Sequence, residues 1–374
     1  MSRSPEITLL LSTYEKPRHL RRALLSIALQ EGVGGKIELV VTDDGSTDET
    51  SRIVEEFGRE VDFPVRFVTH PHEGFQLSRC RNEGVRAAVA PYLLFLDGDC
   101  ILPPDHVRHH LDRRREGVVM GGDCCRMEQE ASERIGEEMI RRVGYPSLAP
   151  PSELRRLAKR HRKAWFYNLI RHPAKPKLVG NNIAVWRKDY VRINGYDERF
   201  VGWGCEDDDL RLRLKRAGVR VESILGTTFT YHLWHPPHES TPERWREGAN
   251  VSYLRRPIRL TRCRQGLVKL AEDDLVIRCA GEPEPGSEWP PPLPAPFRLS
   301  PEAFPVEVEL LFRPGRGGFS GQADCNILVV QPGAKPHTRD LAHAHIVVGE
   351  KRWGGSRRTN FPPGALADAL RSLL

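Results

Sequence analysis

Apolar runs of strand length alternate with helix-like segments along the first hundred residues. Residues 7–11 form one such run, and Leu20, Ala23, Leu24 and Ile27 then follow the spacing of one helix face. The alternation continues through strand-like runs at 36–42, 65–69 and 92–96 and helical segments at 49–57 and 77–89. This order predicts an α/β fold of half-Rossmann layout, with a mostly parallel sheet covered by helices on both faces.

Polar residues stand at the ends of three of these strand-like runs. Residues 12–14 follow the first run, Asp43 and Asp44 follow the second, and residues 97–99 follow the fourth. Ligands of open parallel sheets bind beyond the carboxyl ends of the strands. We therefore expect these residues to surround one crevice.

The pattern changes after residue 127. Residues 128–177 are expected to be helical, and further strands and a helix are expected at 178–180, 183–186, 206–217, 219–223 and 227–231. Between residues 281 and 301, eight of 21 residues are proline, which is typical of a linker or an extended wrapping segment. Strands at 306–312, 326–330 and 344–348 and a helix at 364–374 should follow.

The length of 374 residues agrees with two domains, since one domain usually takes about 100–200 residues. We expect an α/β domain over 1–280 with a helical insertion at about 128–177, a proline-rich linker over 281–301, and a small β-rich α+β domain over 302–374. Hydrophobic residues make up 39% and charged residues 29%, which excludes a disordered or collagen-like chain.

The sequence carries no apolar run approaching the ~18–20 residues that cross a bilayer. No signal peptide precedes the first strand-like run, so we expect a cytoplasmic protein. The eight cysteines form no CxxC pair, which disfavours a structural zinc site and favours reduced thiols.

The positive charge is local. The whole chain has a net charge of +7, whereas residues 151–177 hold nine basic residues and one acid. This concentration disfavours a nucleic-acid partner for the chain as a whole. The basic helix around 154–163, with Trp165 and Phe166 behind it, has two interpretations: peripheral contact with the inner face of the membrane or with an acceptor, or a solvated helix that packs on the core through Leu154, Leu157 and Trp165.

Asp97, Gly98 and Asp99 directly follow the buried strand at 92–96. Two carboxylates around a glycine offer hard oxygen ligands for Mg²⁺ or Mn²⁺, and the glycine leaves room for a diphosphate. The alternative is an ordinary acidic turn.

Four acids in succession, 206–209, open the helix expected at 206–217. One or two acids complement the helix dipole, but four repel one another and tend to raise the pKa of one of them. We expect Asp208 and Asp209 to be structural, and Glu206 and Asp207 to face the crevice.

Histidines supply a third candidate group. His232 and His235 follow a predicted strand, and Mn²⁺ accepts imidazole beside carboxylates, so one of the two is expected to be a ligand. His106, His109 and His110 lie on a predicted helix and are expected to be solvated rather than to bind a metal.

Four motifs occur in order along the first hundred residues: STYEKP, VTDDGSTDET, SRCRNEG and LFLDGD. Together they resemble glycosyltransferase family 2, of the GT-A fold. The later stretch NNIAVWRKDYVRINGYDERFVGWGCEDDDLRLRLKRAG resembles the C-terminal catalytic half shared by beta-1,4-galactosyltransferases and bacterial chondroitin polymerases. The resemblance covers roughly residues 5–240, and the last ninety or so residues match no family we can name.

The resemblance implies a nucleotide-sugar donor, usually a UDP-sugar, and Mn²⁺ or Mg²⁺. By motif position, Ser12, Tyr14 and Asp44 are expected to surround the uracil and ribose, with Arg81 nearby. Arg79 is a further candidate at the same motif.

The resemblance also implies the metal site. Asp97 is expected to contact the ribose or the metal shell, with Gly98 beside the diphosphate, and Asp99 is expected to bind the metal. His232 or His235 should complete the site, and the HxxH spacing leaves the choice open.

On the acceptor side, Asp207 occupies the place of the catalytic base of the inverting relatives. Glu206 and Trp203 correspond to acceptor-binding residues, and Asn182 is a further acceptor-side candidate. Cys205 stands where a glycine is usual, so either the local turn or the acceptor contact is expected to differ.

The expected function is a GT-A glycosyltransferase that moves a sugar to a glycan or other hydroxyl acceptor with inversion. Retaining relatives with a polypeptide acceptor carry an amide after the glutamate, and this chain has Asp207 there. A retaining peptide or protein glycosyltransferase is the first alternative, and a non-catalytic binder of anionic polymers is the second.

Overall fold

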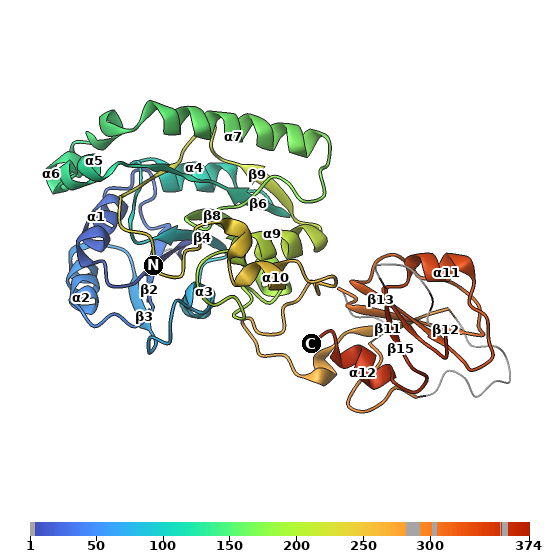
Figure 1. The fold of residues 1–374 in the computed structure, drawn as a ribbon. Coiled ribbons are helices and arrows are strands. Elements are labelled where there is room, and N and C mark those ends of the chain that lie inside the picture. Colours follow the sequence, from blue (N-terminus) through green and yellow to red (C-terminus); the bar gives the residue numbers. More distant parts are fainter. Residues whose placement is uncertain (1–3, 282–291, 301–304, 352, 354–357) are drawn as a thin grey trace. The chain divides into compact units, whose positions relative to one another are not determined.

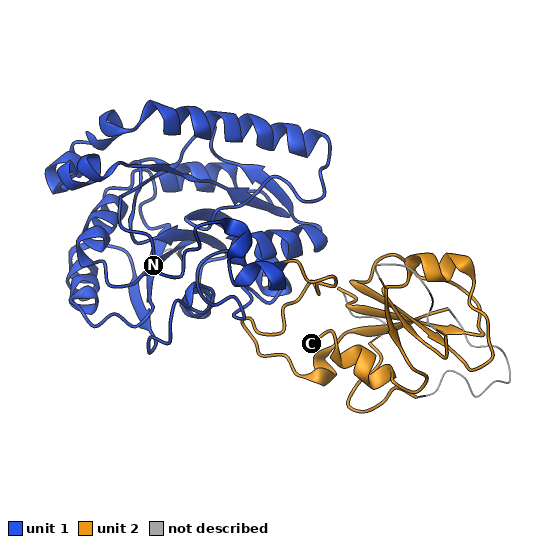
Figure 2. Cartoon of the chain, viewed as in Figure 1, with its two compact units in different colours: residues 1–254 blue, residues 255–374 orange. Residues whose placement is uncertain are grey.

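The computed structural model describes residues 4–281, 292–300, 305–351, 353 and 358–374. The chain forms two compact units, Met1–Leu254 and Arg255–Leu374 (Figure 2). Each has its own sheet and its own apolar core.

A seven-stranded sheet in the order β3-β2-β1-β4-β8-β6-β9 forms the centre of the first unit (Figure 1). Its strands are β1 (Ile7–Thr13), β2 (Ile37–Asp43), β3 (Val65–Thr69), β4 (Tyr92–Asp97), β6 (Val118–Gly121), β8 (Asn182–Trp186) and β9 (Arg220–Ser223). All neighbours are parallel except β8, which runs antiparallel to both β4 and β6. The expected α/β fold with a mostly parallel sheet is therefore confirmed, as a mixed sheet.

Helices cover both faces of this sheet, which is why β1, β2 and β4 are buried apolar runs rather than alternating ones. On one face, α1 (Pro17–Ala28), α2 (Thr50–Glu60) and α4 (His106–Arg113) pack on strand residues such as Leu9 and Leu94. On the other face lie α3 (Leu77–Ala87) and α8 (Arg187–Arg192), where Gly84 approaches Leu10 and Tyr190 contacts Phe95. Beside β9 packs α9 (Glu206–Arg216).

A second, three-stranded sheet has the order β5-β10-β7. Its strands are β5 (Cys100–Ile101), β7 (Cys124–Arg126) and β10 (Thr230–His232). Because β10 pairs with β5, His232 lies opposite Cys100, and the N–H of Leu233 donates to the carbonyl of Asp99 at 2.9 Å. This sheet brings two segments that are far apart in sequence to one place.

The region expected to be helical contains α5 (Gln129–Arg134), α6 (Glu137–Arg141), a 3-10 turn at Tyr145–Leu148 and the long α7 (Pro151–Leu169), which runs along one side of the unit (Figure 1). Leu157 of α7 is buried, but Leu154 is 40% and Trp165 67% exposed. The prediction that these two residues pack on the core is therefore wrong. None of the helices in the described part of the chain is both long and apolar enough to cross a bilayer.

Two histidines of α4 also differ from expectation. His106 and His110 are fully buried rather than solvated. Nδ1 of His106 lies 2.8 Å from the hydroxyl of Thr228, and Nε2 of His110 lies 2.9 Å from the amide oxygen of Asn182. Burial lowers the pKa of His110 to about 4, so it stays neutral and structural.

The second unit holds a five-stranded sheet, parallel throughout and in chain order, with strands β11 (Ile277–Ala280), β12 (Val308–Arg313), β13 (Cys325–Val330), β14 (Ile346–Val348) and β15 (Thr359–Phe361). The helices α11 (Thr338–His343) and α12 (Leu366–Arg371) accompany it. The small C-terminal domain expected to be β-rich is thus organised around a parallel sheet.

The boundary between the units lies at Leu254, before residue 280, because Leu260, Leu275 and Ile277 belong to the core of the second unit. Shorter elements flank it: 3-10 turns at Trp245–Glu247 and Glu272–Asp274, and α10 (Asn250–Leu254). Part of the expected linker, 282–291, lies outside the described residues, whereas Phe297 packs into the second unit's core. Residues 178–180, expected as a strand, are irregular.

Candidate active site

The strand ends of the first unit meet as the sequence predicts. In the register of the sheet, Ser12 lies beside Asp97 and Thr13 beside Asp43. The N–H of Gly98 donates to the carbonyl of Ser12 at 2.7 Å. A Cβ on Gly98 would lie 3.0 Å from that carbonyl oxygen, so a side chain would be tight there.

Tyr14 and Asp44 lie on one side of this edge, with partners that the sequence motifs do not reveal. The Tyr14 ring stacks on His72 with centroids 4.3 Å apart, and Oδ2 of Asp44 accepts the N–H of Gln76 at 3.1 Å. Oδ1 of Asp44 is buried and has no hydrogen-bond partner among the described residues. Burial raises the pKa of Asp44.

The guanidinium of Arg81 joins the two acidic motifs. It is fully buried and donates to Oδ1 of Asp97 at 3.2 Å, to Oδ1 of Asp207 at 3.0 Å and to the hydroxyl of Tyr196 at 3.1 Å. Although burial disfavours the charged form, Tyr196, Asp207 and Asp97 hold the pKa of Arg81 well above its usual range. Arg81 therefore links the donor-side and acceptor-side motifs.

Asp207 lies in the first turn of α9 and is held from three directions. Its Oδ2 accepts the N–H of Gly180 at 2.7 Å, and its Oδ1 accepts the Tyr196 hydroxyl at 3.0 Å as well as Arg81. A Cβ on Gly180 would lie 2.4 Å from Nη2 of Arg81, so only glycine allows this approach. The Asp207 side chain remains 20% exposed, so it is oriented but accessible.

Glu206 contrasts with its neighbour. Its side chain is buried, and Oε2 has no hydrogen-bond partner within the described residues. Burial, followed by the negative charge of Asp207, raises the pKa of Glu206 to about 8. At neutral pH this carboxyl is therefore mainly protonated.

The other two acids of the run form ion pairs within the first unit, as expected for structural residues. Asp208 pairs with Arg211 at 2.8 Å and with Lys177 at 3.2 Å. Asp209 pairs with Arg213 at 2.6 Å, and both side chains are fully buried.

Asp99, His232 and His235 come together through the small sheet. Their ligand atoms all lie within 4.8 Å of one another, with Nε2 of His232 3.4 Å and Nε2 of His235 3.1 Å from the Asp99 carboxylate. One carboxylate and two imidazoles suit a borderline divalent cation such as Mn²⁺. Both histidines lie close to Asp99, so the geometry does not choose between the two that the sequence offered. A second group, Asp44, His70 and Cys80, is also close enough to hold a metal.

The sequence itself settles which family these residues come from. Residues 8–168 match the family described as Glycosyl transferase family 2, and residues 160–236 match the N-terminal domain of galactosyltransferase. The chain belongs to glycosyltransferase family 2.

Relatives of this family 2 member include Validoxylamine A glucosyltransferase of Streptomyces hygroscopicus subsp. limoneus, 30% identical over 277 residues, which are 68% of this chain and 55% of the relative. Chondroitin synthase of Escherichia coli is 24% identical over 261 residues, 66% of this chain and 37% of that protein. The chain thus spans about half or less of the length of these relatives.

Solved structures similar to the chain include Staphylococcus aureus TarS 1-349 in complex with UDP-GlcNAc, with a TM-score of 0.41, 16% identity and coverage of 62% of this chain and 60% of that one. Mannosyltransferase PcManGT from Pyrobaculum calidifontis, in complex with GDP-Man and Mn2+, has a TM-score of 0.41 and 19% identity, covering 65% and 59%.

Among the family's expected acceptor-side residues, Trp203 is 42% exposed at the surface, and its N–H donates to the Ser240 hydroxyl at 3.1 Å. Asn182, by contrast, is not exposed. Its side chain is fully buried against Gly122 and bonds His110 inside the unit. Arg79 pairs with Glu83 at 3.1 Å.

Proposed function

We propose that the chain is a metal-dependent glycosyltransferase that moves a sugar from a UDP-sugar to a hydroxyl acceptor with inversion, using Asp207 as the general base. The observation that carries the proposal is the arrangement of Asp207: an accessible carboxylate, oriented by three donors and joined through Arg81 to Asp97. A base needs this combination of fixed direction and open access.

The donor would bind along the strand ends. Oδ1 of Asp44, which lies 3.5 Å from Nε2 of His70 and has no hydrogen-bond partner among the described residues, offers an acceptor for an N–H of the uracil. The Tyr14–His72 stack offers an aromatic face beside it. Ser12 stands next to Asp97 in the sheet, where a ribose would lie. Gly98, having no side chain, lets the chain pass close to Ser12 and Thr13 at the strand end where the diphosphate would lie.

Asp99, His232 and His235 would hold the divalent cation, because a carboxylate and two imidazoles lie within one coordination sphere's reach. Bound there, Mn²⁺ would neutralise the charge that develops on the departing diphosphate. Lys16, whose Nζ lies 3.0 Å from Asp99, adds a second positive charge on this side. These groups share the task of stabilising the leaving group.

Asp207 would take the proton of the acceptor hydroxyl as its oxygen attacks the anomeric carbon from the face opposite the diphosphate. The bond from the acceptor oxygen to the anomeric carbon forms as the bond to the diphosphate breaks, and one displacement inverts the configuration. The Tyr196 hydroxyl and the Gly180 N–H keep the carboxylate in position. The alternative, a retaining peptide glycosyltransferase, predicts unchanged anomeric configuration in the product.

We also propose that α7 contacts an anionic membrane surface. Trp165, Phe166 and Leu169 are exposed near its end, with Leu154 exposed near its start. Residues 151–177, which include α7, carry nine basic residues against one acid. Aromatic and aliphatic side chains on a basic helix are typical of helices that lie in a bilayer interface.

A panel of nucleotide-sugars tests the function directly. Full-length protein with Mn²⁺ is expected to release UDP slowly from one UDP-sugar through hydrolysis, without any acceptor. EDTA should stop the release, and His235→Ala should weaken its dependence on Mn²⁺. His109→Ala, a change at a half-buried residue of α4 outside the site, should not. Absence of metal-dependent release from every donor in the panel would refute the proposal.

A further inference from the structure

A cavity of about 420 Å³ lies beside α7 in the first unit. Its walls come from α7, from the glycines that end β6, from β9 and from residues 175–177. Six of the lining side chains are cationic: Arg156, Lys159, Arg160, Lys163, Lys175 and Lys177. We call this cavity the basic pocket. Its one acidic lining residue, Glu222, is ion-paired with Arg115.

The six cations differ in how they are neutralised. Arg156 and Arg160 both reach the buried Asp123, at 2.7 and 2.6 Å, and Lys177 pairs with Asp208. The other three, Lys159, Lys163 and Lys175, have no carboxylate oxygen within 4.0 Å in the described parts of the chain. The pocket thus concentrates positive charge that the protein does not balance.

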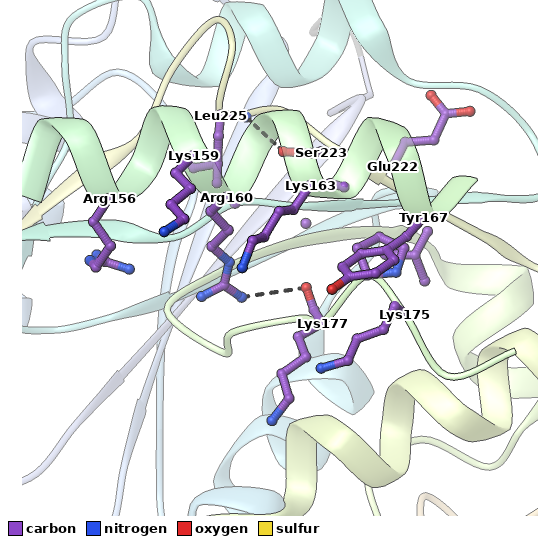
Figure 3. Close-up of a pocket in the computed structure, with 15 residues that line it drawn as sticks. Arg156, Lys159, Arg160, Lys163, Tyr167, Lys175, Lys177, Glu222, Ser223 and Leu225 are labelled. Carbon is purple, nitrogen blue, oxygen red and sulfur yellow. Dashed lines mark hydrogen bonds between the residues drawn. The ribbon is translucent and has the colours of Figure 1, made fainter. Parts of the chain in front are cut away.

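The geometry directs these charges to one space. Lys163 follows Arg160 by three residues and Lys159 by four, so both of these side chains are its neighbours on one side of α7. In Figure 3 they extend from the helix toward the segment that carries Lys175 and Lys177. Burial and the charge of Lys177 lower the pKa of Lys175, as expected when cations are crowded together.

The basic pocket also lies close to the proposed base. Lys177 contacts Asp208, the neighbour of Asp207 in the chain. Gly180, whose N–H donates to Asp207, is three residues beyond Lys177, so their Cα atoms are at most about 11 Å apart. The pocket therefore borders the acceptor side of the site.

We propose that the basic pocket binds a phosphate ester or a comparable multiply charged oxyanion, and that this oxyanion is part of the acceptor. Lysine ammonium groups and arginine N–H groups are the side chains that bind such anions, and the pocket holds both. The assignment of the oxyanion to the acceptor rests on the proposed transferase function, whereas the binding itself does not.

The test is a calorimetric titration of the full chain with inorganic pyrophosphate in EDTA-containing buffer, so that no metal at Asp99 contributes. Lys159→Ala/Lys163→Ala is expected to weaken binding by roughly 10- to 100-fold, since each variant site removes a charge-assisted contact. Arg155→Ala/Arg162→Ala removes the same charge from exposed positions of α7 outside the pocket lining and should leave affinity unchanged. Thermal unfolding checks that both variants fold.

Three results would overturn the proposal: no binding of pyrophosphate, equal losses in the two double variants, or displacement of pyrophosphate by excess UDP, which would make the pocket part of the donor site. Binding of phosphatidylglycerol vesicles that needs Lys159 and Lys163, without binding of pyrophosphate, would reassign the pocket to a membrane surface and also overturn it.

The titration with pyrophosphate and the assay of UDP release can succeed or fail independently of each other. Pyrophosphate binding without metal-dependent UDP release supports the pocket and refutes the transferase. UDP release without pyrophosphate binding supports the transferase and refutes the pocket.

Discussion

Arg81 is the residue on which the two halves of the site depend. It contacts Asp97, at the end of β4, and Asp207, at the start of α9, while its own side chain is buried. The buried positive charge offsets the mutual repulsion of the carboxylates around it. The proposed base and the proposed donor site thus share one cation, which fixes their relative positions within the first unit.

Cys205 holds a left-handed backbone conformation, with φ at 79°. A side chain there costs about 1–2 kcal/mol, which glycine avoids. We predict that the free energy of unfolding of Cys205→Gly is about 1 kcal/mol higher than that of Cys205→Ala. Both variants lack the sulfur, but only the alanine keeps the strained left-handed conformation. Denaturant unfolding of the two variants measures the difference, and an equal or lower stability of the glycine variant would contradict it.

The raised pKa of Glu206 predicts that the stability of the protein depends on pH. Its pKa is about 8 in the folded protein against an ordinary 4.5, so between these values the folded state keeps a proton that the unfolded state has released. The stabilisation that Glu206 contributes to the free energy of unfolding is therefore fully present below pH 4.5. It is lost as pH rises toward 8, by at most ~1.4 kcal/mol per pH unit. Glu206→Gln should flatten this slope between pH 5.5 and 7.5 in metal-free unfolding experiments.

Asp208→Asn is the matched control for that experiment. Despite burial, Arg211 and Lys177 lower the pKa of Asp208. The stabilisation that Asp208 contributes is therefore fully present at any pH above the ordinary pKa of an aspartate, and it changes only under more acidic conditions. Its substitution should reduce stability about equally at pH 5.5 and 7.5. A wild-type slope retained in Glu206→Gln would show that another group titrates.

At the scale of elements, sequence periodicity predicts single strands, each formed by one continuous segment of the chain. The sequence predicts β1, β2 and β4 to within two residues, because buried strands of a parallel sheet are largely apolar along their length. The edge strand β3 is only partly buried, yet its bounds are predicted as well. The two- and three-residue strands β5 and β7 carry too few positions for any period, so the small sheet was missed. That sheet is what brings both histidines to Asp99.

In the site too, local sequence patterns do not predict contacts between residues that are far apart in the chain. Helix electrostatics predicts that Asp208 and Asp209 are structural, and both form ion pairs. That Glu206 and Asp207 face the crevice stays a prediction. The burial of Asn182 could not be predicted, because it depends on Gly122 and His110, which lie far from it in sequence. The basic pocket depends likewise on α7 and on 175–177 meeting β6 and β9.

The exposed side of α7 gives a prediction for the membrane. Trp165→Ser/Phe166→Ser should reduce co-sedimentation with phosphatidylglycerol vesicles several-fold, because two large apolar side chains no longer enter the interface. Lys159→Ala/Lys163→Ala, on the pocket side, should reduce it less. Unchanged co-sedimentation of the aromatic variant would rule out this contact surface.

At the scale of the whole chain, the two units have separate cores, and the proposed site lies within the first. Scanning calorimetry is therefore expected to resolve two transitions. A ligand that binds only a folded unit stabilises that unit, by about 2.7 kcal/mol at a hundred times its Kd. UDP with Mn²⁺ should raise the midpoint of one transition and leave the other in place, whereas equal shifts of both would contradict independent units.

The role of Asp207 is the central claim, and one comparison tests it most directly. Wild-type protein and Asp207→Asn are titrated with UDP and Mn²⁺, and their rates of sugar transfer or donor hydrolysis are measured under the same conditions. The amide keeps the shape of the side chain but cannot take the acceptor's proton, so binding should be preserved while turnover falls by about two to four orders of magnitude. Turnover near the wild-type rate, with binding intact, would show that Asp207 is not the base.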